Sequence, residues 1–277
     1  MAAEAPFSAP PANTSKISKN GRRASNYLIM PYRKVEFVND EIYHTILRGI
    51  DGNVIFKDIN DYYRGIFSIY EFNNAKPVSI QEKRNIRNRF KKSITKEIGR
   101  PTSNNVGFVD TRDILVDILA FCFMPNHIHL LLKQVKEDGI HNFMVKLGSG
   151  YGRYFNQKNQ RKGYVFQNRF QSVHMKDDNQ LRVAVNYIHA NPISIIEPNF
   201  KEQGIKNHSA DEVFNFLKED YKWSSFPDYV GVKNFPSVTE RNFISDIMGG
   251  EKSLIANITD WILYKKELSI YENMLIK

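Results

Sequence analysis

Two histidines separated by one residue, His127 and His129, are the side chains in this sequence best placed to do chemistry. They follow an apolar run over residues 118–125 and precede three leucines, a pattern that predicts buried β-strand. Alternate side chains of a strand share a face, so both imidazoles are expected to point the same way, roughly 7 Å apart along the strand. Two such imidazoles can hold one divalent cation. Ordinary histidines satisfied by local hydrogen bonds are the alternative interpretation.

A second candidate group lies on a helix predicted over residues 179–190, which Pro192 ends. Tyr187 and Asn191 are four residues apart and therefore share one helical face. Facing a metal ion, the phenolate of Tyr187 would attack a scissile phosphate and store its energy as a phosphotyrosine bond, while the metal polarised the phosphate. The carbonyl oxygen of Asn191 would complete a coordination set that suits Mg²⁺ or Mn²⁺. The alternative for Tyr187 is an aromatic residue that packs in the core.

The charge of the chain favours a polyanionic partner, and nucleic acid above all. Lysine and arginine number 39 against 30 acids, a formal net charge of +9. Residues 81–100 hold eight basic and two acidic side chains and predict a basic helix, and between residues 151 and 170 basic residues stand beside aromatic ones, as in proteins that bind single strands. Solvated or core-facing surfaces are the alternative for both segments. The residues expected to contact DNA are Arg48, Arg84, Arg87, Arg89, Lys91, Lys92, Arg153, Arg161, Lys162 and Arg169.

The elements that must position these residues follow the order β-α-β-β-α-β and then a helix. Strands are predicted over residues 43–48, 113–123, 127–135 and 165–175, with helices starting at Asp58 or Asn60, at Gly139, and after Asp177 or Asp178. This order predicts an α+β, ferredoxin-like fold, in which an antiparallel sheet carries helices on one face and leaves the other free for a site. Helices near residues 211–219 and 254–274 would form a C-terminal extension.

The cellular compartment is suggested by what the sequence lacks. Residues 1–27 are rich in Ala, Pro, Ser, Asn and Lys, which predicts a disordered basic tail without an apolar signal core. No apolar run reaches the ~20 residues of a membrane span. The single cysteine, Cys122, allows no internal disulfide, which favours a reducing compartment such as the cytoplasm.

The histidine segment over residues 123–132, FMPNHIHLLL, resembles the HUH motif of the REP-associated tyrosine transposases, within the insertion-sequence HUH single-strand transposase family. The similarity continues in order along the chain and covers roughly residues 40–232. Its further segments lie at residues 43–49, 54–62, 154–156, 163–170, 187–192 and 221–225.

This resemblance implies a nuclease that cuts and rejoins single-stranded hairpin or repeat DNA through a 5′-phosphotyrosine intermediate. By resemblance, His127 and His129 bind the divalent ion and Tyr187 is the nucleophile. Asn191 occupies the polar position one turn later, where the insertion-sequence relatives carry glutamine. Those relatives are dimers that exchange the tyrosine, whereas the REP-associated branch can act as a monomer, so both a monomer and a homodimer remain open.

The resemblance also suggests a division of the chain. Residues 28–232 would form the catalytic domain, residues 75–112 a basic insertion within it that widens the DNA-contacting surface, and residues 233–277 a helical C-terminal extension.

Two other functions compete with the nuclease. A DNA-binding protein without turnover, such as a domesticated transposase that recognises a hairpin, would use the same surface. A metal-dependent hydrolase of another kind would need carboxylate ligands, for which Asp113 and Asp117 on the preceding strand are the candidates. Three further histidines, His44, His174 and His189, are left out of the catalytic set, although His44 on the first strand could border the site.

Overall fold

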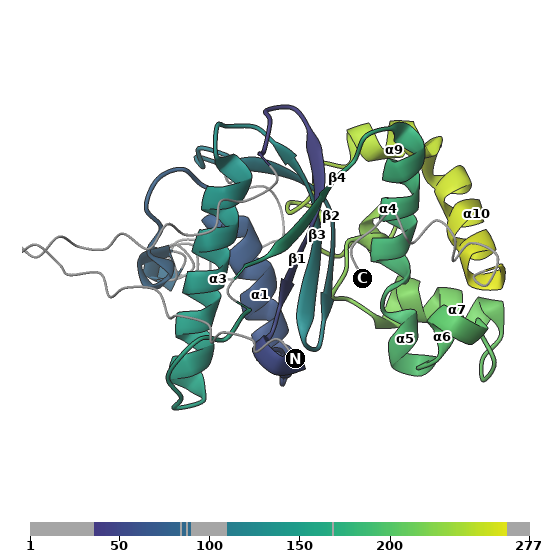
Figure 1. The fold of residues 1–277 in the computed structure, drawn as a ribbon, viewed down its shortest axis with the longest axis horizontal. Helices are drawn as coiled ribbons and strands as arrows, with labels where there is room; N and C mark the ends of the chain where they lie inside the picture. The colour runs from purple at the N-terminus through teal and green to yellow at the C-terminus, as the bar shows by residue number, and fades with distance from the viewer. Residues whose placement is uncertain (1–35, 84, 87, 90–109, 168, 265–277) are drawn as a thin grey trace, which may run out of the picture. The chain divides into compact units, whose positions relative to one another are not determined.

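The centre of the domain is a four-stranded antiparallel sheet. The computed structural model describes residues 36–83, 85–86, 88–89, 110–167 and 169–264. The strands are β1 (Ile42–Arg48), β2 (Val116–Met124), β3 (His127–Gln134) and β4 (Gln171–His174), and they lie in the order β2-β3-β1-β4 (Figure 1). The structure therefore confirms an α+β fold built on an antiparallel sheet.

Two helices cover one face of this sheet, and the chain reaches them in the predicted order. They are α1 (Ile59–Phe72) and α3 (Gly139–Lys158), which contact each other. Asp58 caps α1, because its side chain accepts hydrogen bonds from the first backbone N–H groups of the helix. Ile128, Leu130 and Leu132 of β3 point to this side and share its apolar core. The predicted alternation along β3 is thus confirmed.

The opposite face is covered as well, which corrects the expectation of an open face. Helix α4 (Asp178–Ala190), capped by Asp177, packs against β2 and β3 (Figure 1). Its apolar side chains join Leu131 of β3 in a second core. The extra cover arises because α4 is amphipathic and needs a partner for its apolar face, and this face of the sheet supplies one.

The chain after α4 forms short helices that enclose the second core. They are α5 (Ile193–Ile196), α6 (Phe200–Gln203), α7 (Ala210–Asn215) with a π-helical turn (Phe216–Asp220), α8 (Phe226–Tyr229), α9 (Asn242–Met248) and α10 (Gly250–Leu263). The helix predicted over 211–219 corresponds to α7 and its π-helical turn. The helix predicted over 254–274 begins earlier, because Gly249 and Gly250 adopt positive φ and separate α9 from α10. Residues 265–277 lie outside the described part.

The fourth strand is shorter than the sequence pattern predicts. Only residues 171–174 pair with β1, and the strand predicted over 165–175 contributes one further isolated bridge, between Phe166 and Gly49. Val165 and Phe166 are both buried in the core beneath α1 and α3. Two consecutive buried side chains break the alternation of a strand, so the apolar signal here came from loop residues that fill the core.

Both outer strands of the sheet, β2 and β4, leave few backbone N–H and C=O groups free on their outer edges. β4 has four residues. The backbone of β2 forms hydrogen bonds with the chain that follows α7. Phe123 N donates to Trp223 O. In the other direction, Ser225 N donates to Phe121 O and Glu240 N donates to Ile118 O. A register shift between Ile118 and Ala120 interrupts the pairing of β2 with β3. The loop after α7 therefore covers much of the free edge of β2.

The basic segment is only partly described. Residues 80–83, 85–86 and 88–89 are helical, in agreement with the predicted basic helix, and Arg89 is exposed. Arg84, Arg87, Lys91 and Lys92 lie outside the described residues, as does the predicted tail over residues 1–27. The limits proposed for the insertion and the C-terminal extension remain predictions. None of the helices in the described ranges combines the length and apolar composition that crossing a bilayer requires.

Candidate active site

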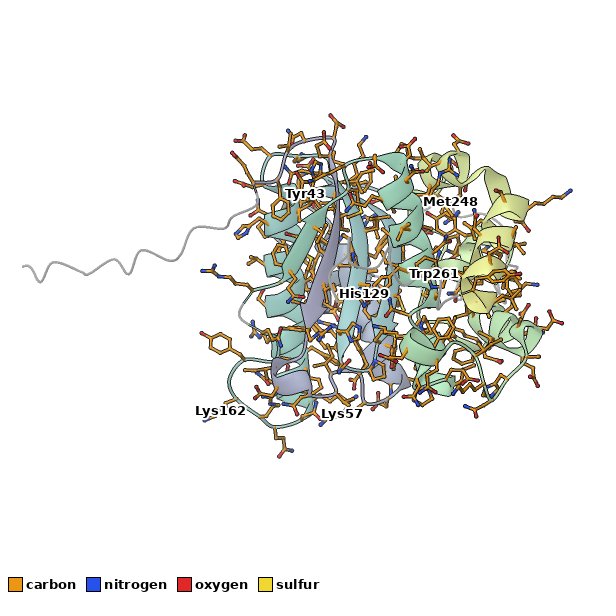
Figure 2. The ribbon with its side chains drawn as sticks, turned by 45° about the vertical axis from the view of Figure 1, so that its right-hand side comes forward. Tyr43, Lys57, His129, Lys162, Met248 and Trp261 are labelled. Atoms are coloured by element: carbon orange, nitrogen blue, oxygen red, sulfur yellow. The ribbon has the colours of Figure 1, made fainter. Side chains whose placement is uncertain are left out.

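The two histidines lie at the start of β3, on the sheet face that α4 covers. β2 ends at Met124 and β3 begins at His127, so Pro125 and Asn126 form a two-residue turn between them. The imidazole centroids of His127 and His129 are 4.7 Å apart with the rings nearly perpendicular. The predicted juxtaposition of the two imidazoles is therefore present. Figure 2 shows His129 in the middle of the domain, between the sheet and the C-terminal helices.

Hydrogen bonds fix one nitrogen of each ring. The amide nitrogen of Asn126 donates to the carbonyl oxygen of Gly52, which turns its Oδ1 toward His127 Nδ1 at 2.6 Å. That contact requires a proton on His127 Nδ1 and leaves the lone pair on Nε2. His129 Nδ1 lies 3.0 Å from Nε2 of His44, and His129 Nε2 is buried without a hydrogen-bond partner among the described residues. Neighbouring residues thus orient the imidazoles through one ring nitrogen, as hydrogen-bond partners of metal-ligating histidines do.

Burial keeps these imidazoles neutral. It lowers the pKa of His44 and that of His127 to about 3, and it takes the pKa of His129 well below its usual value. The positive charges of Arg48 and Lys201 lower the pKa values of His127 and His129 further. Neutral imidazole is the form that binds a metal ion, so the site is prepared for a cation at neutral pH.

The tyrosine helix places Tyr187 against the histidines. The Tyr187 ring lies 5.5 Å from that of His129 and 5.9 Å from that of His44, edge-on in both cases, and only 4% of the residue is exposed. The helix delivers the ring there because Leu181, Val185 and Ile188 of α4 are buried in the core against the sheet. The structure therefore brings together His127, His129 and Tyr187, which are 58 to 60 residues apart in sequence.

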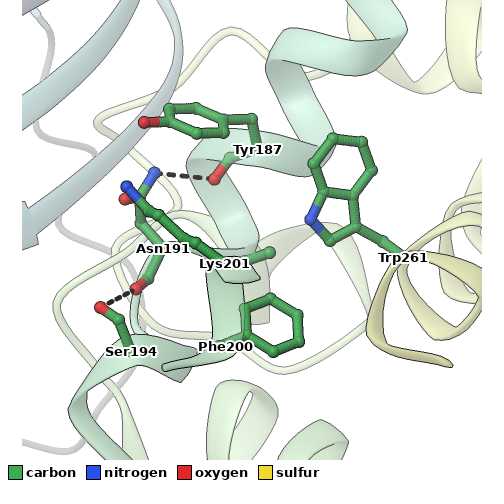
Figure 3. A pocket seen from close by; sticks show the side chains of 7 residues that line it. Tyr187, Asn191, Ser194, Phe200, Lys201 and Trp261 are labelled. Atoms are coloured by element: carbon green, nitrogen blue, oxygen red, sulfur yellow. Dashed lines mark hydrogen bonds between the residues drawn. The ribbon is translucent and has the colours of Figure 1, made fainter. Parts of the chain in front are cut away.

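Asn191 stands one turn beyond Tyr187, as its spacing predicts. It is 6% exposed, and its amide nitrogen donates to the carbonyl oxygen of Tyr187 at 2.8 Å (Figure 3). With the nitrogen engaged, Oδ1 is the atom that remains for a cation or a substrate. A small pocket beside it is lined by Tyr187, Ala190, Asn191, Ser194, Phe200, Lys201 and Trp261.

Two nitrogen atoms of the site, Nε2 of His127 and Nε2 of His129, suit a divalent cation. Within the described part of the chain, His129 Nε2 is a buried nitrogen without a hydrogen-bond partner, and His127 lies on the same side of the sheet. In the described ranges no group of three or more His, Cys, Asp and Glu side chains is placed to hold a metal ion. The predicted ligand set contains only two such side chains, His127 and His129. Its third member, Asn191, is an amide and is not counted among them. We therefore treat Mg²⁺ or Mn²⁺ as compatible with these residues.

The structure also places two cationic side chains at the site. Arg48, expected to contact DNA, pairs with His127 across β1 and β3, and its Nε is buried without a hydrogen-bond partner in the described part of the chain. Lys201 of α6 extends over the Tyr187 ring, with Nζ 5.5 Å from the ring centroid. Sequence reasoning missed Lys201, because a four-residue helix shows no periodicity and nothing in the sequence links residue 201 to Tyr187.

The other residues expected to contact DNA divide into two groups. The loop that contains Arg161, Lys162 and Arg169 hydrogen-bonds to β1 and its following turn: Gln167 N donates to Arg48 O, and Ile50 N donates to Val165 O. This loop therefore lies at the end of the sheet that carries His127. Arg153 is exposed on α3, on the sheet face opposite α4, so the structure does not bring it to Tyr187.

The remaining histidines and the strand carboxylates lie apart from this centre. His189 is buried and contacts Ser225 Oγ at 2.9 Å, and His174 pairs with Glu41 at 2.7 Å. Asp117 pairs in register with Lys133, six residues along β3 from His127, which is about 20 Å away. Asp113 bonds to Lys136. The carboxylates that another type of metal hydrolase would need are thus at the far end of the strands.

Comparison with known proteins finds one matching family model. Residues 84–191 match the model described as "Transposase IS200 like", and this segment contains His127, His129, Tyr187 and Asn191. This segment of the chain is thus similar to an IS200-like transposase domain. Among solved structures it is similar to one described as "Structure of the REP associates tyrosine transposase bound to a REP hairpin", with 13% sequence identity, a TM-score of 0.38, and coverage of 77% of this chain and 96% of that chain. No match was found among curated proteins.

Proposed function

We propose that this protein is a transposase-type endonuclease that cuts and rejoins single-stranded hairpin or repeat DNA, with Tyr187 as its nucleophile. The observation that carries the proposal is the position of Tyr187, whose ring lies 5.5 Å from that of His129 inside the segment that matches the IS200-like family. A tyrosine beside two neutral, oriented imidazoles is an arrangement suited to covalent attack on phosphorus.

The reaction transfers one phosphodiester bond to the protein. The Tyr187 oxygen bonds to the scissile phosphorus and gives its proton to water, and the bond from phosphorus to the 3′ oxygen breaks. The 3′ oxygen takes up a proton and leaves as a free hydroxyl, while the 5′ phosphate stays on Tyr187. Attack by a 3′ hydroxyl reverses these steps and rejoins the strand, so no external energy source is needed.

Residues of the chain would bind the cation and the phosphate. His127 and His129 would hold the metal ion through their Nε2 atoms, with Asn191 Oδ1 as a further oxygen donor. When bound, a divalent cation would polarise the scissile phosphate and stabilise the departing oxygen. Arg48, whose side chain lies beside His127, would contact a DNA phosphate, because guanidinium groups bind phosphate oxygens in pairs.

The loop next to Arg48 supports a path for the single strand. The Arg161 guanidinium lies 5.7 Å from the centre of the Phe155 ring, and Lys57 Nζ lies 5.2 Å from the same ring. Tyr164 is 77% exposed, which leaves an aromatic face on which a base could stack. Figure 2 shows Lys57 and Lys162 at the same end of the domain. Arg161 also donates a hydrogen bond to the carbonyl oxygen of Tyr164, so cations and an exposed aromatic side chain occur on one loop, the combination that single-strand binding uses.

The test is the covalent adduct itself. Wild type and Tyr187→Phe are incubated with hairpin single strands labelled at the 3′ end, which is the end that stays on the protein, and run on a denaturing gel. We expect a shifted band with Mg²⁺ or Mn²⁺, none with EDTA and none with Tyr187→Phe. Tyr63→Phe is the matched control, because Tyr63 is half exposed on α1, on the sheet face opposite the site.

The same gel separates the competing functions. DNA binding without an adduct, across a panel of hairpins that the protein binds, would favour the DNA-binding protein without turnover. Cleavage that persists undiminished in Tyr187→Phe would instead favour a metal-dependent hydrolase.

A further inference from the structure

Among the residues that the structure describes, Lys201 is the one charged side chain that lines the pocket beside Tyr187. Its Nζ lies 5.5 Å from the centre of the Tyr187 ring. Figure 3 shows the Lys201 side chain running past Asn191, with its ammonium group on the same side of α4 as the Tyr187 hydroxyl. A cation at this position faces the place where a group attacked by Tyr187 must lie.

The segment that carries Lys201 is anchored on both sides. Phe200 is 3% exposed and buried in the core with α4. Glu197, also 3% exposed, accepts hydrogen bonds from the backbone N–H groups of Asn207 and His208 and from the Asn207 side chain. These contacts close the loop around α6. The backbone of Lys201 is therefore held in place, and only its side chain needs to adjust to a ligand.

Lys201 shares this part of the site with a second cation, Arg48, which pairs with His127 across β1 and β3. Arg48 comes from β1 and Lys201 from α6, so the two cations approach the histidines from different elements. Two cationic side chains on this side of the sheet make the region electropositive, which favours an anionic ligand between them.

We propose that Lys201 contacts a non-bridging oxygen of the scissile phosphate while Tyr187 attacks it. This inference rests on the function proposed above. The phenolate oxygen bonds to phosphorus as the bond to the 3′ oxygen breaks, and negative charge builds up on the non-bridging oxygens. The ammonium group stays protonated throughout, donates hydrogen bonds to these oxygens, and stabilises the transition state more than the uncleaved strand.

Removing the charge should slow the chemical step. With protein in excess over DNA, we expect Lys201→Gln to form the adduct about 100- to 1,000-fold more slowly than wild type, the loss seen when one transition-state donor is removed. Affinity for the uncleaved hairpin should change less than the rate. Lys201→Arg should recover most of the rate, because it restores a cation. Lys206→Gln is the matched control, since Lys206 is an exposed lysine in the following loop.

The single buried cysteine allows a chemical rescue. Lys201→Cys should be as slow as Lys201→Gln until it is treated with 2-bromoethylamine, which converts the new cysteine into an ammonium-bearing analogue of lysine. Cys122 should stay unmodified, because it is fully buried and burial raises the pKa of its thiol, whereas the thiolate is the reactive form. Treated Lys201→Gln controls for reaction elsewhere. We expect the treated cysteine variant to recover at least half of the lost rate.

The results separate this inference from the proposed function. If wild type forms no adduct, both are wrong. If wild type reacts and Lys201→Gln matches it within twofold, only the role of Lys201 is overturned. The same holds if neither arginine nor aminoethylation restores the rate while thermal unfolding is unchanged, because the loss then does not depend on the charge.

Discussion

At the scale of single residues, His44 lies against the candidate metal ligand His129. Its Nε2 lies 3.0 Å from His129 Nδ1, and its ring stacks on that of His129. If His129 donates from Nδ1, its Nε2 keeps the lone pair that a metal ion requires. The opposite direction would put the proton on Nε2 and block binding. His44 therefore selects the useful tautomer only when it accepts the hydrogen bond, with its own proton on Nδ1.

Replacing His44 should weaken metal binding without removing a ligand. We expect His44→Ala to raise the Kd for Mn²⁺ about 10- to 100-fold, as loss of a second-shell partner usually does. His44→Gln, whose carbonyl oxygen can accept the same hydrogen bond, should recover part of the affinity. Titration calorimetry measures the Kd, and exposed His141→Ala serves as the control. An unchanged Kd in His44→Ala, with the fold intact, would show that His44 does not orient His129.

The periodicity of strands and helices made four residues of this site predictable from the sequence. Strand alternation required His127 and His129 to share a face, and helical spacing required Tyr187 and Asn191 to do so. His44 and Lys201 have no such local signal, because their roles depend on contacts across strands and between helices. Arg48 was expected to contact DNA, but its position beside His127 follows only from the register of β1 and β3. The sequence therefore indicated the candidate nucleophile and the candidate ligands better than the groups around them.

At the scale of elements, the contact between α1 and α3 depends on one glycine. Two glycines, Gly148 and Gly150, lie inside α3, where glycine lowers helix stability. A Cβ at Gly150 would lie 2.2 Å from the ring of Phe72 on α1, whereas a Cβ at Gly148 would meet nothing within 4 Å. Close packing of α3 against α1 thus requires a glycine at position 150. Gly148 lowers helix stability, and no close contact requires a glycine there.

The two glycines form a matched pair of tests. We expect Gly150→Ala to lower the free energy of unfolding by about 1–3 kcal/mol, because Phe72 must move. Gly148→Ala should raise it by up to about 1 kcal/mol through helix propensity. Urea denaturation of both variants measures the difference. Equal effects of the same sign would contradict the packing explanation.

The elements were predicted best where caps and alternation coincide. Asp58 and Asp177 cap α1 and α4 as expected, since their side chains satisfy the free N–H groups of the first turn. The prediction was wrong for the fourth strand, where consecutive buried residues imitate a strand, and for the open face of the sheet. No local pattern shows which surface an amphipathic helix such as α4 will cover.

At the scale of the whole molecule, the tyrosine and the histidines of one chain already meet. α4 packs on β2 and β3 of its own chain, and α10 packs on α4 from the other side. Trp261 of α10 is 3% exposed and lines the pocket with Tyr187. This arrangement favours attack by Tyr187 on DNA held at the histidines of the same chain, whichever oligomer forms.

A complementation experiment tests the single-chain site. His129→Ala and Tyr187→Phe are each expected to lack adduct formation, and a mixture of the two, incubated long enough for subunits to exchange, should stay inactive. If the tyrosine acted across a dimer interface, mixed dimers would contain one complete site and would recover activity. A refolded mixture provides the control for slow exchange.

The sheet edges described above also bear on how this protein behaves at high concentration. An uncovered strand edge offers free N–H and C=O groups to a neighbouring molecule and can start aggregation. Here β4 presents four residues, and the chain around Trp223 and Glu240 occupies hydrogen-bonding groups of β2. One short edge and one largely covered edge therefore let copies of this chain crowd at high concentration without joining their sheets.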